Sequence, residues 1–216
     1  MKRRILVVDI GGSSVKLLMS ERAEREFASG PRMTPKQFLA KFRETVRGWK
    51  FDVVSIGFPA PVRDGRILRK PKHLGKDWMH FNFARVLRIP VRIVNDAAMQ
   101  ALGSYDGGAM LFLGLGTGLG SAMIRDGVLI PLELAHLPYH DGKTYEEWVG
   151  DAAYKEMKRR TWRKHVLHII DLFVAAFVVD YVVLGGGNAR HMKNLPRFVR
   201  VGSNANAFKG GFRLWE

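Results

Sequence analysis

The pattern of apolar and polar positions divides the chain into two halves of similar organisation. In the first half, buried strands are predicted over residues 4–9, 15–19, 51–58 and 90–94, with a helix from Thr34-Pro35 and a short helix over 95–103. In the second half, strands are predicted over residues 109–113, 121–124, 128–131 and 181–184, with helices over 161–178 and 188–195. Each half opens with a strand, a glycine-rich turn and another strand, which is a weak two-fold echo. The long helix becomes apolar on most faces toward its end, which predicts that this end is buried.

The glycine-rich turn of the second half lies within LFLGLGTGLGSAMIRDGV, where Gly114, Gly116, Gly118 and Gly120 fall at every second position. A phosphate loop of the GxxxxGK[ST] kind needs a lysine that is missing here. The dinucleotide motif G-x-G-x-x-G fails in both registers, and no helix is predicted after the loop. The remaining interpretation is a β-hairpin whose backbone N–H groups at Gly116, Thr117 and Gly118 can approach phosphate oxygens. A purely structural glycine turn is the alternative.

The first half carries a matching turn, Asp9-Ile10-Gly11-Gly12-Ser13-Ser14-Val15-Lys16. An acid at the end of a strand, directly before a turn rich in glycine and hydroxyl groups, suits a Mg²⁺ ion held through water beside a phosphate. A hairpin with an incidental acid is the alternative. Two such turns in one chain are stronger evidence for phosphate binding than either turn would be alone.

Two further pairs of polar residues are candidates for substrate chemistry. Asn95 and Asp96 stand where a predicted strand runs into a helix, and Asp96 could take a proton from a substrate hydroxyl. A simple helix N-cap is the alternative for this pair. Glu133 and His136 could bind sugar hydroxyls; a metal site would need further ligands that the sequence does not offer, and a surface acid with a structural histidine is the third interpretation.

The charge of the chain is unusual and unevenly placed. The 216 residues carry a net charge of +15, and residues 1–104 hold 21 Lys and Arg against 9 Asp and Glu, a balance of +12. Such a field favours an anionic partner, whether nucleic acid, polyanion or phosphorylated substrate, unless it only keeps the protein soluble. Basic residues gather within 66–76 and 155–165, where contact with nucleic acid or polyphosphate is one interpretation and a solvated surface the other.

The cysteine content and the hydropathy of the chain restrict the cellular location that we expect for the protein. The chain has no cysteine, which excludes disulfides and thiolate metal sites and fits a cytoplasmic protein. No apolar run reaches the ~18 residues that a membrane-spanning helix needs. The apolar stretch at residues 5–8 is too short for a signal peptide.

Six stretches, taken in order, resemble the ROK family of sugar kinases, and within it the polyphosphate/ATP glucokinase branch. They are the Asp-Gly-Gly turn at Asp9, the Gly-Phe-Pro loop at Gly57, Asn95-Asp96, the hairpin at Gly114–Gly120, Glu133-x-x-His136 and the triple glycine at Gly185. The resemblance implies an α/β fold of two actin-like ATPase (ribonuclease H-like) domains, with mixed sheets flanked by helices and a cleft between the domains. It implies domains at residues 1–104 and 105–216.

The resemblance also assigns roles to residues. Asp96 would be the general base, and Asp9 would hold Mg²⁺ through water. The remaining assignments are phosphate binding by Asp9, Gly11, Gly12, Ser13, Ser14, Lys16, Gly116, Thr117 and Gly118; sugar binding by Gly57, Pro59, Asn95, Asp96, Glu133 and His136; and nucleotide binding by Gly185, Gly186, Gly187 and Asn188.

The activity implied by the resemblance is phosphoryl transfer from ATP or inorganic polyphosphate to a hexose, most simply glucose. The resemblance also implies a cytoplasmic protein with no membrane partner, and a homodimer is one possible assembly. The cysteine-rich zinc site of many ROK proteins is absent, so no structural zinc is expected. Ala135 replaces a usual glycine, and Pro71-Lys72-His73-Leu74 stands where the family often has Pro-Asn-Leu. These departures keep a catalytically impaired sugar- or nucleotide-binding protein open as an alternative. A nucleic-acid-binding protein is the weaker one, because the sequence shows no recognition helix or aromatic RNA motif.

Overall fold

The computed structural model describes residues 3–19, 23–203 and 205–216. By their internal contacts, the described residues up to Met99 form a first unit together with Ala207–Glu216, and Gln100–Asn206 form a second. The chain therefore passes between the units inside helix α3 (Asp96–Ser104) and at the start of helix α7 (Asn206–Arg213). The sequence predicted a division at 104/105 with residues 207–216 in the second domain. By internal contacts, residues 100–104 belong to the second unit, and residues 207–216 belong to the first, where α7 packs.

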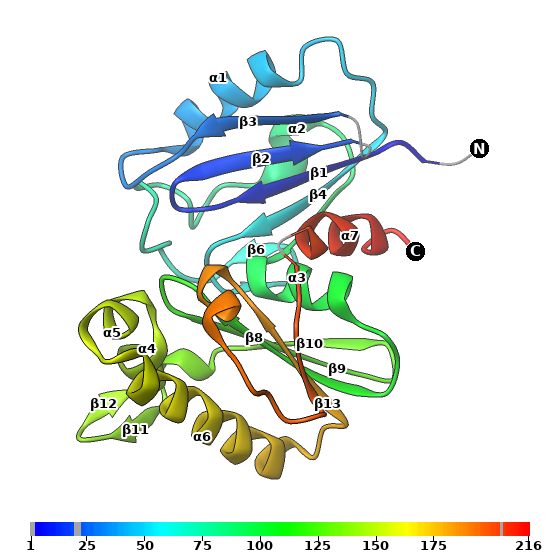
Figure 1. Ribbon diagram of the computed structural model, residues 1–216. Helices are drawn as coiled ribbons and strands as arrows, with labels where there is room; N and C mark the ends of the chain where they lie inside the picture. The colour runs from blue at the N-terminus through cyan, green and yellow to red at the C-terminus, as the bar shows by residue number, and fades with distance from the viewer. Residues whose placement is uncertain (1–2, 20–22, 204) are drawn as a thin grey trace. The chain divides into compact units, whose positions relative to one another are not determined.

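The first unit is built on a five-stranded mixed sheet with the order β3-β2-β1-β4-β7 (Figure 1). Strands β1, β2 and β3 are antiparallel neighbours, whereas β1, β4 and β7 run parallel. The strands are β1 (Ile5–Ile10), β2 (Ser14–Leu18), β3 (Glu24–Ala28), β4 (Val53–Phe58) and β7 (Val91–Asn95), with a small separate pair of β5 (Val62–Arg63) and β6 (Arg66–Ile67).

Alternate residues of β1 face two different helical layers, as the period of a strand requires. Leu6, Val8 and Ile10 join the core under α1 (Pro35–Thr45) and α2 (Phe83–Leu87), where the aromatic side chains of Phe38 and Trp78 lie. On the opposite face, Val7 packs with Met99 of α3 and with Ala207 and Phe208 of α7. The sheet of this unit is thus covered on both faces.

Helix α1 begins as the sequence predicts, with Thr34 as N-cap and Pro35 in the first turn. The structure adds a capping box: the backbone N–H of Gln37 donates to Thr34 Oγ1, and the backbone N–H of Thr34 donates to Gln37 Oε1 at 2.9 Å. Two orphan donors of the helix start are satisfied reciprocally.

The second unit repeats this topology, with the sheet order β10-β9-β8-β13-β14. Again three strands form an antiparallel meander, and β8, β13 and β14 run parallel. The strands are β8 (Ala109–Leu115), β9 (Leu119–Arg125), β10 (Val128–Leu132), β13 (Tyr181–Gly185) and β14 (Val199–Val201). The two-fold echo predicted from the sequence is therefore confirmed as a repeat of the same sheet.

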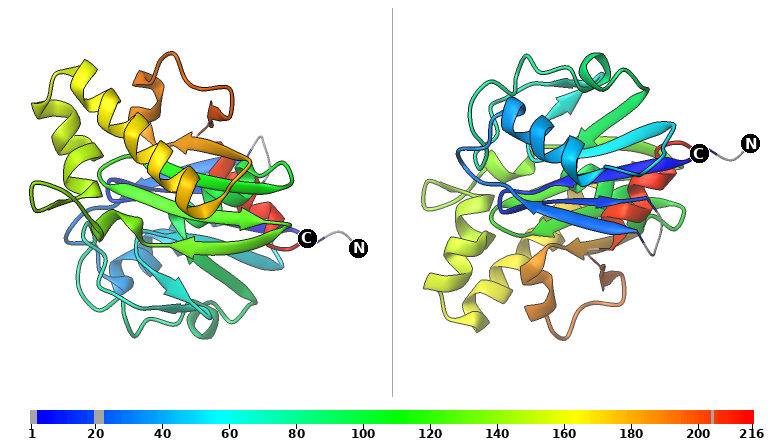
Figure 2. Two further views of the ribbon diagram at one scale, coloured as in Figure 1. Left: turned by 90° about the horizontal axis from the view of Figure 1, so that it is seen from below. Right: turned by 90° about the horizontal axis from the view of Figure 1, so that it is seen from above.

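Helix α6 (Arg159–Phe177) covers one face of the second sheet (Figure 2). Only one side of it is buried, by Trp162, Val166, Ile169, Ile170 and Phe173. The prediction that its end is buried is wrong, since Leu172 is 39% exposed and Val178, just beyond the helix, is 73% exposed. A helix lying on a single sheet can bury only the side that faces the sheet.

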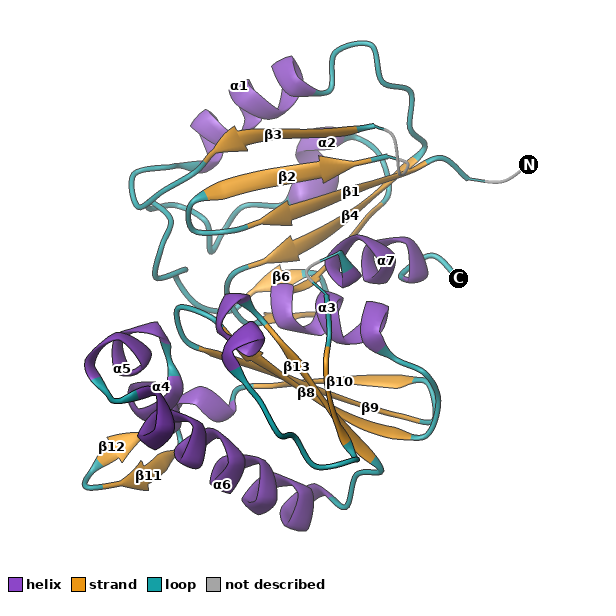
Figure 3. Cartoon of the chain, in the orientation of Figure 1, coloured by secondary structure: helices purple, strands orange, loops and turns teal. Residues whose placement is uncertain are grey.

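The remaining elements of the second unit connect β10 with β13 and β13 with β14. A short hairpin lies against α4, which in turn packs on α6 (Figure 3). These elements are the 3₁₀ helices η1 (Leu134–His136) and η2 (Gly187–His191), strands β11 (Pro138–His140) and β12 (Lys143–Thr144), and helices α4 (Tyr145–Val149) and α5 (Asp151–Glu156).

The helix predicted over 188–195 is wrong. Only the 3₁₀ turn η2 forms there, because Met192 is extended, Asn194 has a left-handed φ of 53°, and Pro196 disfavours helix at the residue before it. Strand β3 was not predicted because its sequence, EREFA, is mostly polar and lies at the sheet edge. Within the described ranges, no helix combines the length and hydropathy needed to cross a membrane.

Candidate functional site

The turn between β1 and β2 is a closed hairpin with two donors left over. The backbone N–H of Gly11 donates to the carbonyl oxygen of Ser14 at 2.9 Å, and Ser29 ties the turn to the edge strand through its hydroxyl and its N–H. The N–H of Gly11 is thus used within the turn. The N–H groups of Gly12 and Ser13 make no hydrogen bond within the described chain, so these two can face an anion.

The turn between β8 and β9 repeats this arrangement in the second unit. Gly116 donates its N–H to the carbonyl oxygen of Gly118 at 3.1 Å, while the N–H groups of Thr117 and Gly118 have no acceptor within the described residues. The predicted hairpin is confirmed, with Gly114 paired to Gly120. Gly116 has open space where a side chain would lie and no left-handed φ, so packing alone does not require a glycine there.

Asp9 lies at the centre of the first sheet, paired with Lys16 on one neighbour strand and Gly57 on the other. Burial raises the pKa of its carboxyl group to about 6, partly offset by the positive charge of Lys16. No hydrogen bond to this carboxylate is found within the described chain. A partly buried carboxylate next to open backbone donors fits Mg²⁺, which is commonly bound through one or two carboxylates, several waters and the phosphates of a substrate. Within the described residues no group of three or more potential metal ligands exists.

Asn95 and Asp96 lie at the junction of β7 and α3. The Asn95 side chain accepts from the backbone N–H of Ala97 at 2.9 Å and donates to the carbonyl oxygen of Ala60 at 3.3 Å. Asp96 Oδ1 also accepts from Ala97 N–H, at 2.8 Å. Asn95 therefore caps the helix and also holds the Pro59-Ala60 loop at the strand-to-helix junction. A capping role for Asn95 is thus compatible with substrate binding at the same place.

Gly57 and His73 each pack against residues of the candidate site in the first unit. Gly57 is buried in β4, where an added Cβ would overlap Met99 and lie 3.3 Å from Asp9 Oδ1, so it makes room for both. His73 covers Gly12: a Cβ at Gly12 would lie 2.7 Å from that of His73. His73 is thus placed against the first glycine hairpin.

In the second unit, the residues after β13 pack against the glycine hairpin. Gly185 pairs with Gly114, and Gly186 adopts a φ of 78° with its Cα against the backbone of Leu115. Asn188 is buried, and its amide nitrogen donates to Asp151 Oδ1 at 3.2 Å. Of the four residues predicted to bind a nucleotide, only Gly187 is exposed. The other three are buried or partly buried and pack inside the unit.

Asp151 links the hairpin to this loop. Its backbone N–H donates to the carbonyl oxygen of Thr117 at 3.3 Å, while its carboxylate accepts from Asn188 and pairs with Lys155 Nζ at 2.5 Å. Lys155 and Asn188 together hold the pKa of Asp151 below its usual range. The sequence analysis did not single out this residue.

Glu133 directly precedes η1 and His136 is its last residue, and both are exposed. Their backbone is fixed from β9 by Ser121, a buried serine whose hydroxyl donates to Leu132 O and accepts from Leu134 N–H. Ala135, between them, is 5% exposed and belongs to the hydrophobic core of the unit, so its methyl group fills the core.

The structure thus gathers Asp9, the first hairpin, Asn95 and Asp96 in one unit, and the second hairpin, Gly185–Asn188, Glu133 and His136 in the other. Sequence reasoning missed three supporting residues: Ser121, Asp151 and Glu146. Glu146 of α4 occupies the space beside Gly118, where a Cβ would overlap its carboxylate. Ser121 directly follows the glycine loop, but neither acid follows a pattern that could have identified it.

Comparison with known proteins agrees with this architecture. No protein-family model matches the chain. The inorganic polyphosphate/ATP-glucomannokinase from Arthrobacter sp. strain KM superposes with a TM-score of 0.82 at 21% identity, covering 100% of both chains. A ROK family glucokinase from Streptomyces griseus, solved with glucose and AMPPNP, superposes with a TM-score of 0.75 at 16% identity, covering 97% of this chain and 98% of that one. This chain has the fold of the ROK sugar kinases.

Sequence relatives of this ROK-fold chain are named polyphosphate glucokinases. The protein from Mycobacterium leprae (strain TN) is 29% identical over 209 residues, which cover 85% of this chain and 63% of that protein. The protein from Mycobacterium tuberculosis (strain H37Rv) is 28% identical over 210 residues, covering 85% and 77% respectively. The match thus spans less than two thirds of the length of the first of these relatives and about three quarters of the second. The resemblance predicted from the six motifs is confirmed, as is the actin-like α/β fold.

Proposed function

We propose that this chain is a sugar kinase that transfers a phosphoryl group from ATP or inorganic polyphosphate to a hexose, with glucose 6-phosphate as the product. The observation that carries the proposal is the pair of glycine hairpins. Each repeat presents two backbone N–H groups that the described chain leaves without an acceptor, at Gly12 and Ser13 and at Thr117 and Gly118. Oriented backbone donors of this kind stabilise the charge of a transferring phosphoryl group.

In this mechanism Asp96 takes the proton from the attacking hydroxyl, the sugar 6-OH. The hydroxyl oxygen then attacks the terminal phosphorus, and the bond from that phosphorus to the remainder of the donor breaks. Asn95 fixes the backbone at Asp96 and holds the Pro59 loop for the sugar, with Glu133 and His136 as further sugar contacts. Positioning of this kind supplies much of the acceleration in phosphoryl transfer.

Asp9 would hold Mg²⁺ through water, and the ion would neutralise charge on the transferring phosphoryl group. Lys16 and the first hairpin would bind donor phosphate, with Gly187 at the nucleotide. The absence of cysteine fits a reducing compartment, and we place the enzyme in the cytoplasm. A homodimer is the assembly to test by sedimentation.

Replacing Asp96 with Asn tests the proposal most directly. Loss of a general base is expected to lower kcat by about 10² to 10⁴-fold while glucose affinity stays close to that of the wild type. Asp64→Asn is the matched control, because Asp64 is an exposed turn residue with a left-handed φ of 52° that asparagine tolerates. The assay is a coupled measurement of sugar phosphate over a panel of hexoses with ATP and with polyphosphate.

Two outcomes would contradict the proposal in different ways. Turnover of Asp96→Asn near the wild-type level would remove Asp96 as the base. Glucose binding by the wild type without transfer from either donor would instead make the chain a non-catalytic sugar-binding protein.

A further inference from the structure

The basic segment at the start of α6 has one aromatic residue, and that residue is not available to a ligand. Lys158, Arg159, Arg160, Arg163 and Lys164 surround Trp162 in sequence. Trp162 is fully buried, and its indole N–H donates to the carbonyl oxygen of Val149. Proteins that bind single-stranded nucleic acid stack bases on exposed aromatic rings. The segment therefore offers charge without stacking, which favours a polyanion that has no bases.

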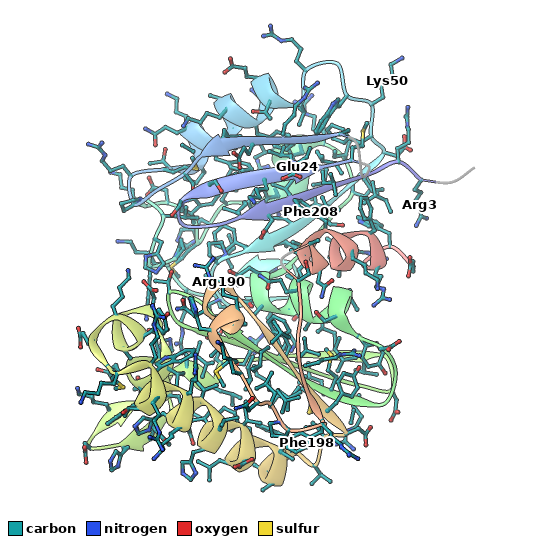
Figure 4. The ribbon with its side chains drawn as sticks, in the orientation of Figure 1. Arg3, Glu24, Lys50, Arg190, Phe198 and Phe208 are labelled. Atoms are coloured by element: carbon teal, nitrogen blue, oxygen red, sulfur yellow. The ribbon has the colours of Figure 1, made fainter. Side chains whose placement is uncertain are left out.

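A second element brings its own cations to this segment. The guanidinium of Arg163 donates to the carbonyl oxygen of His191 in η2 at 2.7 Å, and Arg190 Nε lies 3.3 Å from His191 Nε2. Tyr154 stacks on the imidazole with the ring centroids 4.7 Å apart. Figure 4 labels Arg190 on this segment after β13. Arg159 lies one helical turn before Arg163 in α6. Desolvation, followed by the positive charges of Arg190, Arg159 and Arg163, keeps the pKa of His191 below its usual value.

Among the described residues, no ion pair joins Arg159, Arg163 or Arg190 to an acid. The sequence has no Asp or Glu over residues 157–170 or 181–215. Asp151, a nearby acid, is already paired with Lys155 and bonded to Asn188. Arg159 and Arg163 also lie in the first two turns of α6, where the helix dipole is positive. Like charges held together in this way are unfavourable unless an anion joins them.

The cluster continues directly from the proposed donor site within the same unit. Helix η2 begins at Gly187, next to the loop that packs on the glycine hairpin, and Asp151 joins Thr117 to Asn188. A linear anion with its terminal phosphate at Thr117 and Gly118 could follow this edge from the hairpin past Gly187 to Arg190.

We propose that Arg159, Arg163 and Arg190 bind the chain of inorganic polyphosphate beyond the phosphoryl group that reacts. The proposal rests on the kinase function proposed above and adds the place where the longer donor is held. ATP is too short to need these cations, so they distinguish the two donors.

The test compares two double variants that remove the same charge. Arg159→Gln/Arg190→Gln removes the two exposed cations of the cluster, whereas Arg163 is kept because its bond to His191 O supports η2. Arg160→Gln/Lys164→Gln is the control, since both lie on the neighbouring side of the same helix and neither is among the cations acting on His191. KM is measured for long-chain polyphosphate, tripolyphosphate and ATP, and folding is checked by thermal unfolding.

For Arg159→Gln/Arg190→Gln, KM for long-chain polyphosphate is expected to rise roughly fivefold or more, a few-fold for each exposed cation lost. KM for ATP should stay unchanged, and the preference for long chains over tripolyphosphate should shrink. The slope of log K against log salt should also become shallower by roughly 1.4, about 0.7 per phosphate contact on a single-stranded polyanion.

The proposal is overturned if KM for long-chain polyphosphate does not move, if KM for ATP rises equally, or if the control double variant has the same effect. It also falls if a single-stranded RNA oligonucleotide binds wild type and loses affinity in the variant while polyphosphate does not. A wild type active with ATP and inactive with polyphosphate would overturn it and leave the kinase proposal standing. Inactivity with both donors would overturn the kinase proposal itself.

Discussion

The hydroxyl group of Ser121 donates a hydrogen bond to the carbonyl oxygen of Leu132, 3.1 Å away across the β9–β10 pair. The same oxygen accepts from the N–H of Leu134 at 3.2 Å. One side chain therefore fixes the backbone on both sides of Glu133, at the point where β10 ends and η1 begins. Because Ser121 follows the glycine hairpin in β9, it links the predicted phosphate loop to the predicted sugar residue.

Ser121→Ala is expected to weaken sugar binding through this link. The change leaves a buried carbonyl and N–H without their partner, at a cost of about 1–3 kcal/mol in unfolding free energy. KM for glucose should rise more than kcat falls, since the variant misplaces Glu133 and leaves Asp96 intact. Ser203→Ala is the control, because it removes a hydroxyl–backbone bond from an exposed loop of the same unit. An unchanged KM in a destabilised Ser121→Ala would limit Ser121 to a structural role.

Asp9→Asn is expected to stabilise the metal-free protein at neutral pH. Burial raises the pKa of Asp9 to about 6, so the protonated form is favoured in the folded state. Its contribution is present in full below the unfolded pKa of about 4 and is lost as pH rises through about 6. Asn cannot ionise and should gain up to ~3 kcal/mol over wild type at pH 7.5 but little at pH 4, by urea unfolding. Activity should fall, because the carboxylate proposed to hold Mg²⁺ is lost.

Asp52→Asn is expected to change stability with the opposite pH dependence. The exposed Arg4–Asp52 pair lowers the pKa of Asp52 to about 2, so its contribution is present at neutral pH and lost in acid. Removing Asp52 should therefore cost stability at pH 7.5 and not at low pH. A stability difference for Asp9→Asn that does not change with pH would contradict the assignment of a buried, protonatable carboxyl.

Gly186 and Gly187 are neighbours with different reasons to be glycine. Gly186→Ala should lower the melting temperature, because φ is 78° and a Cβ would overlap the backbone of Leu115. With ψ at 163°, Gly186 lies in a backbone region that essentially only glycine adopts, which alone costs about 1–3 kcal/mol for alanine. Gly187→Ala should leave stability unchanged, since nothing lies within 4 Å of its Cβ position, and should raise KM for ATP if the nucleotide approaches this backbone. Equal effects of both changes on stability would contradict this division.

Gly211→Ala tests the contact of α7 with the first sheet. A Cβ at Gly211 would overlap the side chain of Val7, and the carbonyl oxygen of Gly211 accepts from the buried hydroxyl of Ser55 at 2.5 Å. Overpacking here should cost about 1–3 kcal/mol. Val7→Ala in the same protein should recover part of this loss, which a double-mutant cycle measures. Additive losses would show that α7 does not pack as described.

The structural predictions from the sequence were correct where they depended only on residues close together in the chain. The capped start of α1, both glycine hairpins and the strand-to-helix junction at Asn95 follow from spacing and turn chemistry. The end of α6 and the turn after Gly187 did not, because exposure and helix length there depend on the sheet and on Asn194 and Pro196. Helix α7 was missed altogether, since its partners Ser55 and Val7 lie 156 and 200 residues earlier in the chain than Gly211 and Ala207, respectively.

By itself, the sequence determined the repeated strand–turn–strand order, the places of the two hairpins and of Asp96, and a resemblance to ROK kinases. Only the tertiary structure decided which backbone donors stay open, that Trp162 is buried and not a stacking surface, and that Arg190 joins Arg159 and Arg163 around His191. The physical reason is that turn and strand preferences act between neighbours in the chain. Burial, hydrogen-bond completion and charge clustering arise between residues that meet only after the strands and helices have packed.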